Sequence, residues 1–184
     1  MTTQENLNLR AAESRLPLRH WKAQVNFCDS VFVRAMDAIK VAPPGSIMVV
    51  VGPRGNGKTQ LAVEIGRWLL ETDKSVHYTT PVNLALRFRS ARRWKSEESE
   101  EDVFDSLASV TGLIVDEIGQ DVGNSDDAAL FFRLIDHRYA NLKRTLLIGN
   151  FLATSVSQVL GSSIVSRAHE CGGILDTSTW PPRR

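Results

Sequence analysis

The most constraining feature of this sequence is a glycine-rich stretch that lies between an apolar run and an amphipathic segment. Residues 52–59 read GPRGNGKT, which satisfies the pattern G-x-x-x-x-G-K-[ST] in full. The apolar run 47–51 has the length of a strand, and residues 59–70 carry apolar side chains on one helical stripe. In such a unit the glycines let backbone N–H groups point at phosphate oxygens, and the helix N-terminus adds partial positive charge. The stretch therefore predicts a nucleotide phosphate site rather than a chance glycine-rich turn.

The predicted nucleotide-binding residues are Gly52, Pro53, Arg54, Gly55, Asn56, Gly57, Lys58 and Thr59. The Lys58 ammonium is expected to reach the β- and γ-phosphates, and the Thr59 hydroxyl to ligate Mg²⁺. ATP and Mg²⁺ are the expected ligands.

The rest of the chain alternates short apolar runs with longer amphipathic segments. The predicted strands are 47–51, 76–79, 113–115, 145–148 and 173–175, and the predicted helices include about 25–39, 59–70 and 126–140. Continuous Val/Ile/Leu runs are typical of strands that are buried on both faces of a parallel sheet. The alternation predicts a three-layer α/β fold, with residues 1–20 as an N-terminal arm and residues 21–184 as one domain.

Composition excludes several other classes of protein. The 184 residues are 42% hydrophobic and 23% charged, as in soluble globular proteins. There is no apolar stretch of about 18 residues that would span a membrane, and no apolar core for a signal peptide. Two cysteines, Cys28 and Cys171, suggest a reducing compartment, so we expect a cytoplasmic protein without a membrane partner. A net charge of +1 restricts any nucleic-acid contact to a local patch.

A pair of carboxylates follows the third apolar run. Asp116 and Glu117 come directly after Leu113–Val115, and the carboxyl ends of parallel strands line the ligand crevice. Asp116 is predicted to hold Mg²⁺, and Glu117 to polarise the water that attacks the γ-phosphate. A solvated strand end is the alternative. The second carboxylate favours a hydrolase over a small-molecule kinase, which needs no activated water.

Two further polar residues are candidates for the same chemistry. Asn150 follows the fourth apolar run, where its amide can sense the γ-phosphate, although Asn is also a common turn residue. Arg167 lies in SSIVSRAHE, a predicted short helix that faces away from its own nucleotide. Such an arginine can reach the nucleotide of a neighbouring copy, or it can be an ordinary surface residue.

A basic segment lies between the second and third predicted strands. Thr80 is a predicted helix cap and Pro81 the first helical residue. The candidate single-stranded DNA contacts are Arg87, Arg89, Arg92, Arg93, Trp94 and Lys95. Cations interleaved with an aromatic suit phosphate contacts and base stacking. Because acids at 97–102 follow directly, a solvated helix with internal ion pairs is the alternative.

The motifs together resemble a known family. The order of GPRGNGKTQLA, LIVDEIG, FFRLIDHRYANLKRTLLIGN and IVSRAHECGGIL resembles the AAA+ ATPases of the DnaC/IstB group, which are helicase loaders and transposase helper ATPases. The resemblance covers residues 16–175 and implies a P-loop NTPase of the ASCE type, with strand order 5-1-4-3-2 and no C-terminal helical lid. It implies Walker A roles for Lys58 and Thr59, and Walker B roles for Asp116 and Glu117. It also implies that Asn150 is sensor 1, and that Arg167 is a finger acting in trans.

The resemblance implies an ATP-hydrolysing protein that forms a homo-oligomer in its ATP state on DNA or on a partner. The favoured task is loading a replicative helicase in DNA replication, and the alternative is helping a transposase. A non-hydrolysing, nucleotide-gated adaptor is a third interpretation. The sequence departs from the family in three places. Only about 50 residues precede the phosphate loop, where family loaders carry a helicase-binding domain; Ser162 and Ser163 replace a basic residue near the finger; and Gly149 stands where a hydroxyl residue is common.

Overall fold

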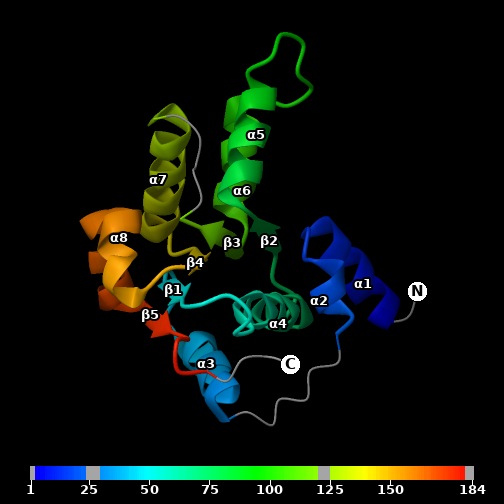
Figure 1. Ribbon diagram of the computed structural model, residues 1–184. Helices are drawn as coiled ribbons and strands as arrows, with labels where there is room; N and C mark the ends of the chain where they lie inside the picture. Colours follow the sequence, from blue (N-terminus) through cyan, green and yellow to red (C-terminus); the bar gives the residue numbers. More distant parts are fainter. Residues whose placement is uncertain (1–2, 24–29, 120–124, 181–184) are drawn as a thin grey trace.

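The structure is a computed structural model that describes residues 3–23, 30–119 and 125–180. Figure 1 shows a parallel sheet whose strands lie in the order β2-β3-β4-β1-β5, which is the predicted order read from the other edge. The strands are β1 (Ile47–Val51), β2 (Val76–Thr79), β3 (Gly112–Ile118), β4 (Arg144–Gly149) and β5 (Gly173–Asp176). The predicted α/β class and strand order are therefore confirmed.

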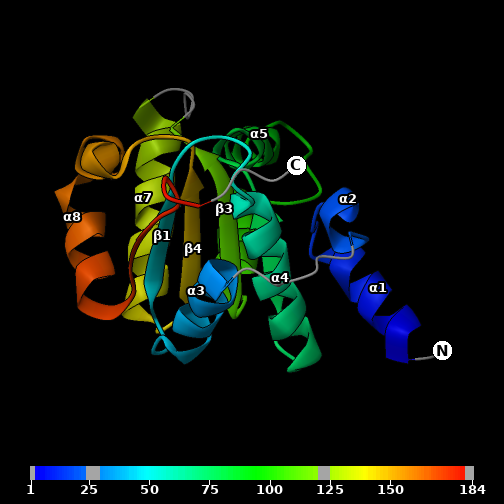
Figure 2. The ribbon, with the colours of Figure 1, turned by 60° about the horizontal axis from the view of Figure 1, so that its bottom comes forward.

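Helices occupy both faces of this sheet. They are α1 (Thr3–Glu13), α2 (Leu18–Trp21), α3 (Ser30–Val41), α4 (Lys58–Glu71), α5 (Pro81–Ala91), α6 (Glu100–Ser109), α7 (Ser125–Ala140) and α8 (Val156–Cys171), with a short 3₁₀ turn at Ala153–Ser155. Figure 2 shows α3 and α4 in front of the sheet and α7 behind it.

The side chains of β1 explain the three layers. All five residues of this strand are buried, and successive side chains of a strand point to opposite faces. Ile47, Val49 and Val51 belong to the core shared with α5–α8. Met48 and Val50 belong to the core shared with α1–α4. A strand that is apolar on both faces must be covered on both, which is why the run contains no polar residue.

Several element boundaries differ from the sequence predictions by one residue, and a few differ by more. β3 continues to Ile118, so both carboxylates lie within the strand rather than after it, and its register with β4 is irregular between Val115 and Ile118. Of the helix predicted over about residues 25–39, the structure describes Ser30–Val41, and the predicted start lies in residues 24–29, outside the described part. The predicted short helix around Arg167 is longer, because α8 begins at Val156 and is kinked at Gly161.

The two N-terminal helices lie against α4, beside the sheet (Figures 1 and 2). Arg10 of α1 donates hydrogen bonds to the Leu70 carbonyl at 3.1 Å and to the Asp73 carboxylate at 2.9 Å. The Tyr78 amide of β2 donates to the Ser14 carbonyl at 2.8 Å. Residues 3–21 are thus joined to both the phosphate-loop helix and the sheet edge.

Residues 177–180, the described part that follows β5, contain no helix. Trp180 is buried against Phe32 of α3, with ring centroids 6.0 Å apart. None of the helices in the described ranges is both long enough and apolar enough to cross a membrane.

Candidate nucleotide-binding site

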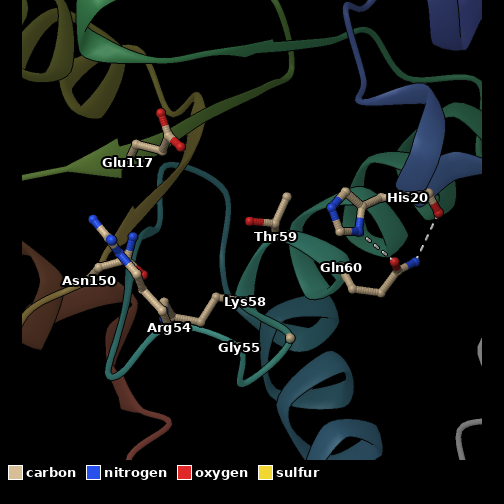
Figure 3. A pocket seen from close by; sticks show the side chains of 9 residues that line it. His20, Arg54, Gly55, Lys58, Thr59, Gln60, Glu117 and Asn150 are labelled. Carbon is tan, nitrogen blue, oxygen red and sulfur yellow. Dashed lines mark hydrogen bonds between the residues drawn. The ribbon is translucent and has the colours of Figure 1, made fainter. Parts of the chain in front are cut away.

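A pocket of about 440 Å³ lies where β1, β3 and β4 end (Figure 3). It is lined by His20, Arg54, Gly55, Gly57, Lys58, Thr59, Gln60, Glu117 and Asn150. The phosphate loop, one residue of the acidic pair and the Asn after β4 therefore meet in one cavity, although they are far apart in the sequence. This is the place where ligands bind in open parallel sheets.

The phosphate loop is held in shape by glycines and by the segment after β5. Gly57 has a left-handed φ of 82° at the position that precedes α4, a conformation that glycine adopts without steric cost. A Cβ on Gly52 would lie 2.3 Å from the Thr177 hydroxyl, so only glycine fits there. The Asn56 side chain is not among those that line the pocket, and it donates to the Thr177 carbonyl at 2.7 Å. The loop is thus anchored before any ligand arrives.

Lys58 is buried, and its hydrogen-bond partners among the described residues are backbone carbonyls. Its Nζ donates to the carbonyls of Gly52 at 2.8 Å and Pro53 at 2.7 Å. Burial lowers the pKa of the Lys58 ammonium, and the negative charge of Asp116 partly offsets this effect. Phosphate oxygens are stronger partners for an ammonium than neutral carbonyls are, because both groups then carry charge. The lysine is therefore placed to exchange these carbonyls for phosphates.

Asp116 is the centre of a small hydrogen-bond cluster beside the pocket. The Thr59 hydroxyl and the Tyr78 hydroxyl each donate to Asp116 Oδ2 at 2.8 Å. The Glu117 amide donates to Asp116 Oδ1 at 2.7 Å. Burial and the neighbouring carboxylate raise the pKa of Tyr78, so this hydroxyl stays a donor. The sequence analysis missed Tyr78, because a tyrosine in a strand carries no signal of its partner.

The contact between Thr59 and Asp116 fits a magnesium ion. A hydroxyl and a carboxylate 2.8 Å apart are hard oxygen ligands, which Mg²⁺ prefers. The described residues contain no group of three or more His, Cys, Asp or Glu side chains suited to a metal. This does not conflict with Mg²⁺, which takes one or two protein ligands and completes its shell with water and phosphate oxygens.

Glu117 reaches the pocket because the backbone of β3 departs from regular geometry. Neighbouring residues in a regular strand point to opposite faces, so Asp116 and Glu117 would diverge. Glu117 instead has a left-handed φ of 63° at the irregular part of the strand. Such a conformation costs on the order of 1–3 kcal/mol for a residue with a side chain. The result is an exposed Glu117 that lines the pocket while Asp116 stays buried at Thr59.

Arg167 lies on α8 and is not among the residues that line the pocket. It forms an ion pair with Asp136 of α7. Its guanidinium also lies 5.0 Å from the ring centroid of Tyr139. The arginine is thus held on the face formed by α7 and α8, away from the nucleotide pocket of its own chain.

The basic segment divides into paired and unpaired side chains. Arg87 pairs with Glu98, Arg89 with Asp127 and Arg92 with Glu100. The pairs of Arg87 and Arg92 match the alternative of internal ion pairs, whereas Asp127, the partner of Arg89, belongs to α7. Arg93 and Lys95 form no ion pair within the described ranges, and Trp94 is 91% exposed.

The unpaired residues line a second hollow, with a volume of about 460 Å³, at the end of α5. Arg15, from the turn after α1, also lines it. The sequence analysis did not associate Arg15 with this region, because residues 15 and 93 meet only in the folded chain.

Comparisons with known proteins agree with this geometry. The family model described as IstB-like ATP binding protein matches residues 45–170. The replicative helicase loader DnaC of Buchnera aphidicola subsp. Baizongia pistaciae is 26% identical over 133 residues, which are 72% of this chain and 54% of the relative. An ATP-binding protein of insertion sequence IS21 from Pseudomonas aeruginosa is 29% identical over 141 residues, 74% of this chain and 52% of the relative. The chain thus spans about half the length of these curated relatives.

Among solved structures, a crystal structure of the DnaC helicase loader has a TM-score of 0.66 and 24% identity, covering 86% of this chain and 98% of that one. At this identity the likeness shows the fold alone. The family match is broader evidence, because it covers more than half of the chain and includes both the phosphate loop and the acidic pair. The chain therefore belongs to the IstB-like ATP binding protein family.

Proposed function

We propose that this protein is an ATPase that assembles with copies of itself on a partner or on DNA, and that it loads a replicative helicase. The observation that carries the hydrolytic part is that Glu117 and Asn150 line the same pocket as Lys58 and Thr59. A site that only bound nucleotide would need Lys58 and Thr59 alone. The Glu117 carboxylate and the Asn150 amide, on the other side of the pocket, can in addition accept a proton from an attacking water and hold it in position.

Each residue has a separate task in this proposal. Lys58 neutralises the phosphates, and Thr59 and Asp116 hold Mg²⁺, which screens phosphate charge and orients the γ-phosphate when it is bound. Glu117 accepts a proton from the attacking water, and Asn150 holds that water or a γ-phosphate oxygen. Arg167 acts on the nucleotide of a neighbouring copy, which supports a homo-oligomer in the ATP state.

The partners follow from the relatives and from the surface. Several similar proteins are helicase loaders, which favours a replicative helicase and a role in DNA replication. The IS21 relative and the family description favour the second candidate, a helper ATPase for a transposase. Residues 1–20 are proposed to serve as the partner-binding arm, residues 21–184 as the ATPase domain, and the end of α5 as a contact for single-stranded DNA. A cytoplasmic location fits all of these tasks.

Glu117→Gln tests the enzymatic part of the proposal. The amide keeps the shape of the side chain but cannot take up the proton, so hydrolysis falls by about 10²–10⁴-fold while ATP binding survives. Turnover is measured by phosphate release and binding by calorimetry. Near-normal turnover would move the catalytic role elsewhere, and slow turnover of the wild type would favour the nucleotide-gated adaptor.

The same variant identifies the client. Glu117→Gln protein retains ATP, so it serves as bait for the ATP-bound assembly, and Lys58→Ala protein, whose ATP affinity is expected to be about 100-fold lower, serves as the matched bait at an ATP concentration that fills only the first. A helicase captured from the native host only by the first bait supports the loader role. A transposase captured in the same way supports the second candidate.

A further inference from the structure

One side chain of the N-terminal helices reaches the nucleotide pocket. His20 of α2 lines the cavity beside Gln60, and its Nδ1 lies 2.9 Å from Gln60 Oε1. Figure 3 shows His20 on the opposite side of Thr59 from Glu117 and Asn150. In the proposed function those two residues mark the γ-phosphate end of the ligand. On that assignment His20 lies at the end of the pocket opposite the γ-phosphate.

The hydrogen bonds around Gln60 fix the proton on the imidazole. Gln60 Nε2 donates to the His20 carbonyl at 3.0 Å and to Glu64 Oε1 at 2.9 Å, which uses both of its hydrogens. Gln60 Oε1 must then accept, so His20 Nδ1 carries the hydrogen. In the neutral ring Nε2 is consequently an acceptor. Figure 3 shows this nitrogen on the side of the ring that faces Thr59.

The same bonds continue away from the pocket to α1. Glu64 Oε2 accepts from Arg67 Nε at 3.1 Å, and Arg67 also donates to the Trp21 carbonyl. The Arg67 guanidinium lies 3.9 Å from the Trp21 ring centroid. Trp21 Nε1 in turn donates to Asn8 Oδ1 at 2.9 Å. A continuous set of polar contacts thus joins the pocket wall to both N-terminal helices.

We propose that His20 accepts a hydrogen bond from the nucleoside, and that a filled pocket strengthens the docking of α1 and α2 on α4. This inference rests on the proposed nucleotide site and adds the N-terminal helices as its responding element. The donor is a ribose hydroxyl or the exocyclic amino group of the base. A ligand bound at Nε2 fixes the imidazole ring whose Nδ1 already bonds Gln60. Fixing the ring also strengthens the hydrogen bonds that continue from Gln60 to Trp21. If nucleotide raises the equilibrium constant for docking of α1 and α2 by some factor, docking must by linkage raise the affinity for nucleotide by the same factor.

Hydrogen exchange of the full chain, read out on peptides covering residues 3–22, tests the coupling. In the wild type, saturating ADP or a non-hydrolysed ATP analogue slows exchange in these helices by about 5–150-fold, the usual range of coupling between two sites. In His20→Ala the slowing is lost, and calorimetric affinity for ATP and ADP falls by about fivefold to tenfold, as expected for one hydrogen bond. Arg19→Ala, an exposed neighbour on α2 that does not line the pocket, is the matched control and behaves as wild type.

Arg67→Ala tests the same contacts without touching the pocket. It speeds exchange of residues 3–22 and lowers nucleotide affinity, although Arg67 does not line the cavity. Deoxy-ATP and inosine triphosphate distinguish the two donors, because His20→Ala loses no affinity for the nucleotide that lacks the bonded group.

The outcomes separate this inference from the proposed function. If nucleotide binds the wild type but leaves exchange of residues 3–22 unchanged, the coupling is wrong and the proposed site stands. If the slowing persists in His20→Ala, the contact is wrong. If no nucleotide binds the wild type, the proposed function itself is wrong.

Discussion

Two regions of this protein are rich in positive charge, and the structure treats them differently. At the phosphate loop, buried Lys58 donates to the backbone carbonyls of Gly52 and Pro53. Along α5, Arg87, Arg89 and Arg92 each face a carboxylate. The first cation has neutral partners that a phosphate can replace at little cost. The others are already neutralised, so a phosphate must compete with a carboxylate. Charge in a sequence therefore predicts anion binding best where the fold leaves the cation without a carboxylate in direct contact.

Arg167 challenges this comparison most directly, because it is paired with Asp136 and yet is proposed to act in catalysis. Arg167→Ala is expected to lower kcat by about 10³-fold or more, the usual contribution of an arginine finger. Mixed with Lys58→Ala, whose finger is intact and whose pocket is dead, it should regain part of the lost activity. Asp136→Asn is the control that removes the partner and keeps the guanidinium. If mixing restores nothing while both proteins still self-associate, a shared site is excluded.

Lys58→Ala tests the unpaired side of the comparison. Two charge-assisted hydrogen bonds to phosphates are lost, which corresponds to about 100-fold weaker ATP binding. Arg89→Ala removes a cation that is paired with Asp127 and should leave ATP affinity unchanged. Both affinities are measured by calorimetry. Tight binding by the Lys58 variant would contradict the assignment of the phosphate loop.

Asp116→Asn sharpens the comparison within the pocket, because it removes a charge and keeps the shape. ATP affinity in the presence of Mg²⁺ should fall by about tenfold, the loss of one charged ligand, while affinity in EDTA stays the same. Tyr78→Phe removes only a neutral donor to Asp116 and serves as the control. Equal losses with and without Mg²⁺ would show that Asp116 supports the fold rather than the metal.

The smallest expected effect separates the unpaired from the paired residues of the basic segment. Replacing Arg93 and Lys95 together by Ala should weaken single-stranded DNA binding about fivefold and reduce the salt slope by about 1.4, since about 0.7 is lost per phosphate contact. Replacing Arg89 and Arg92 should do less. Trp94→Ala should weaken binding with little change in slope, because stacking releases few counter-ions. Fluorescence anisotropy at several salt concentrations measures the DNA affinity of all three variants. An equal loss of affinity in the two double variants would contradict the distinction between paired and unpaired residues.

The sequence predicted those features that depend on local pattern. The limits of β1 and β2 were correct, because β1 is a continuous apolar run between Ser46 and Gly52, and β2 consists mostly of residue types that favour strands and ends at the Thr80 helix cap. The Thr80 cap was also correct, with its hydroxyl accepting from the Asn83 amide. The phosphate loop could be recognised because its chemistry needs consecutive residues.

Features that depend on distant residues could not be predicted. Tyr78 and Asp116 are 38 positions apart, and so are Arg89 and Asp127. His20 and Gln60 are 40 apart. No periodicity connects such residues, so the Tyr78 donor to Asp116, the ion pairs of the arginines and the contact between His20 and Gln60 emerged only from the folded chain. The left-handed Glu117 is a similar case, since nothing in Val-Asp-Glu-Ile marks the irregular strand.

The anchoring of the phosphate loop to Thr177 has a mechanical consequence. The loop is tied to the chain after β5 through Asn56, and its helix is tied to α1 through Arg10. A load applied near residue 180 is therefore transmitted to the phosphate loop through the hydrogen bond between Asn56 and Thr177, whereas a load applied to α1 reaches the Leu70 end of α4, opposite the loop. If one end of the chain were tethered and the other end were held by a bound partner, the two loads would reach the pocket by two different routes. Force-clamp measurements of ATP dwell time, with handles attached near residues 3 and 180, would show which of the two ties yields first.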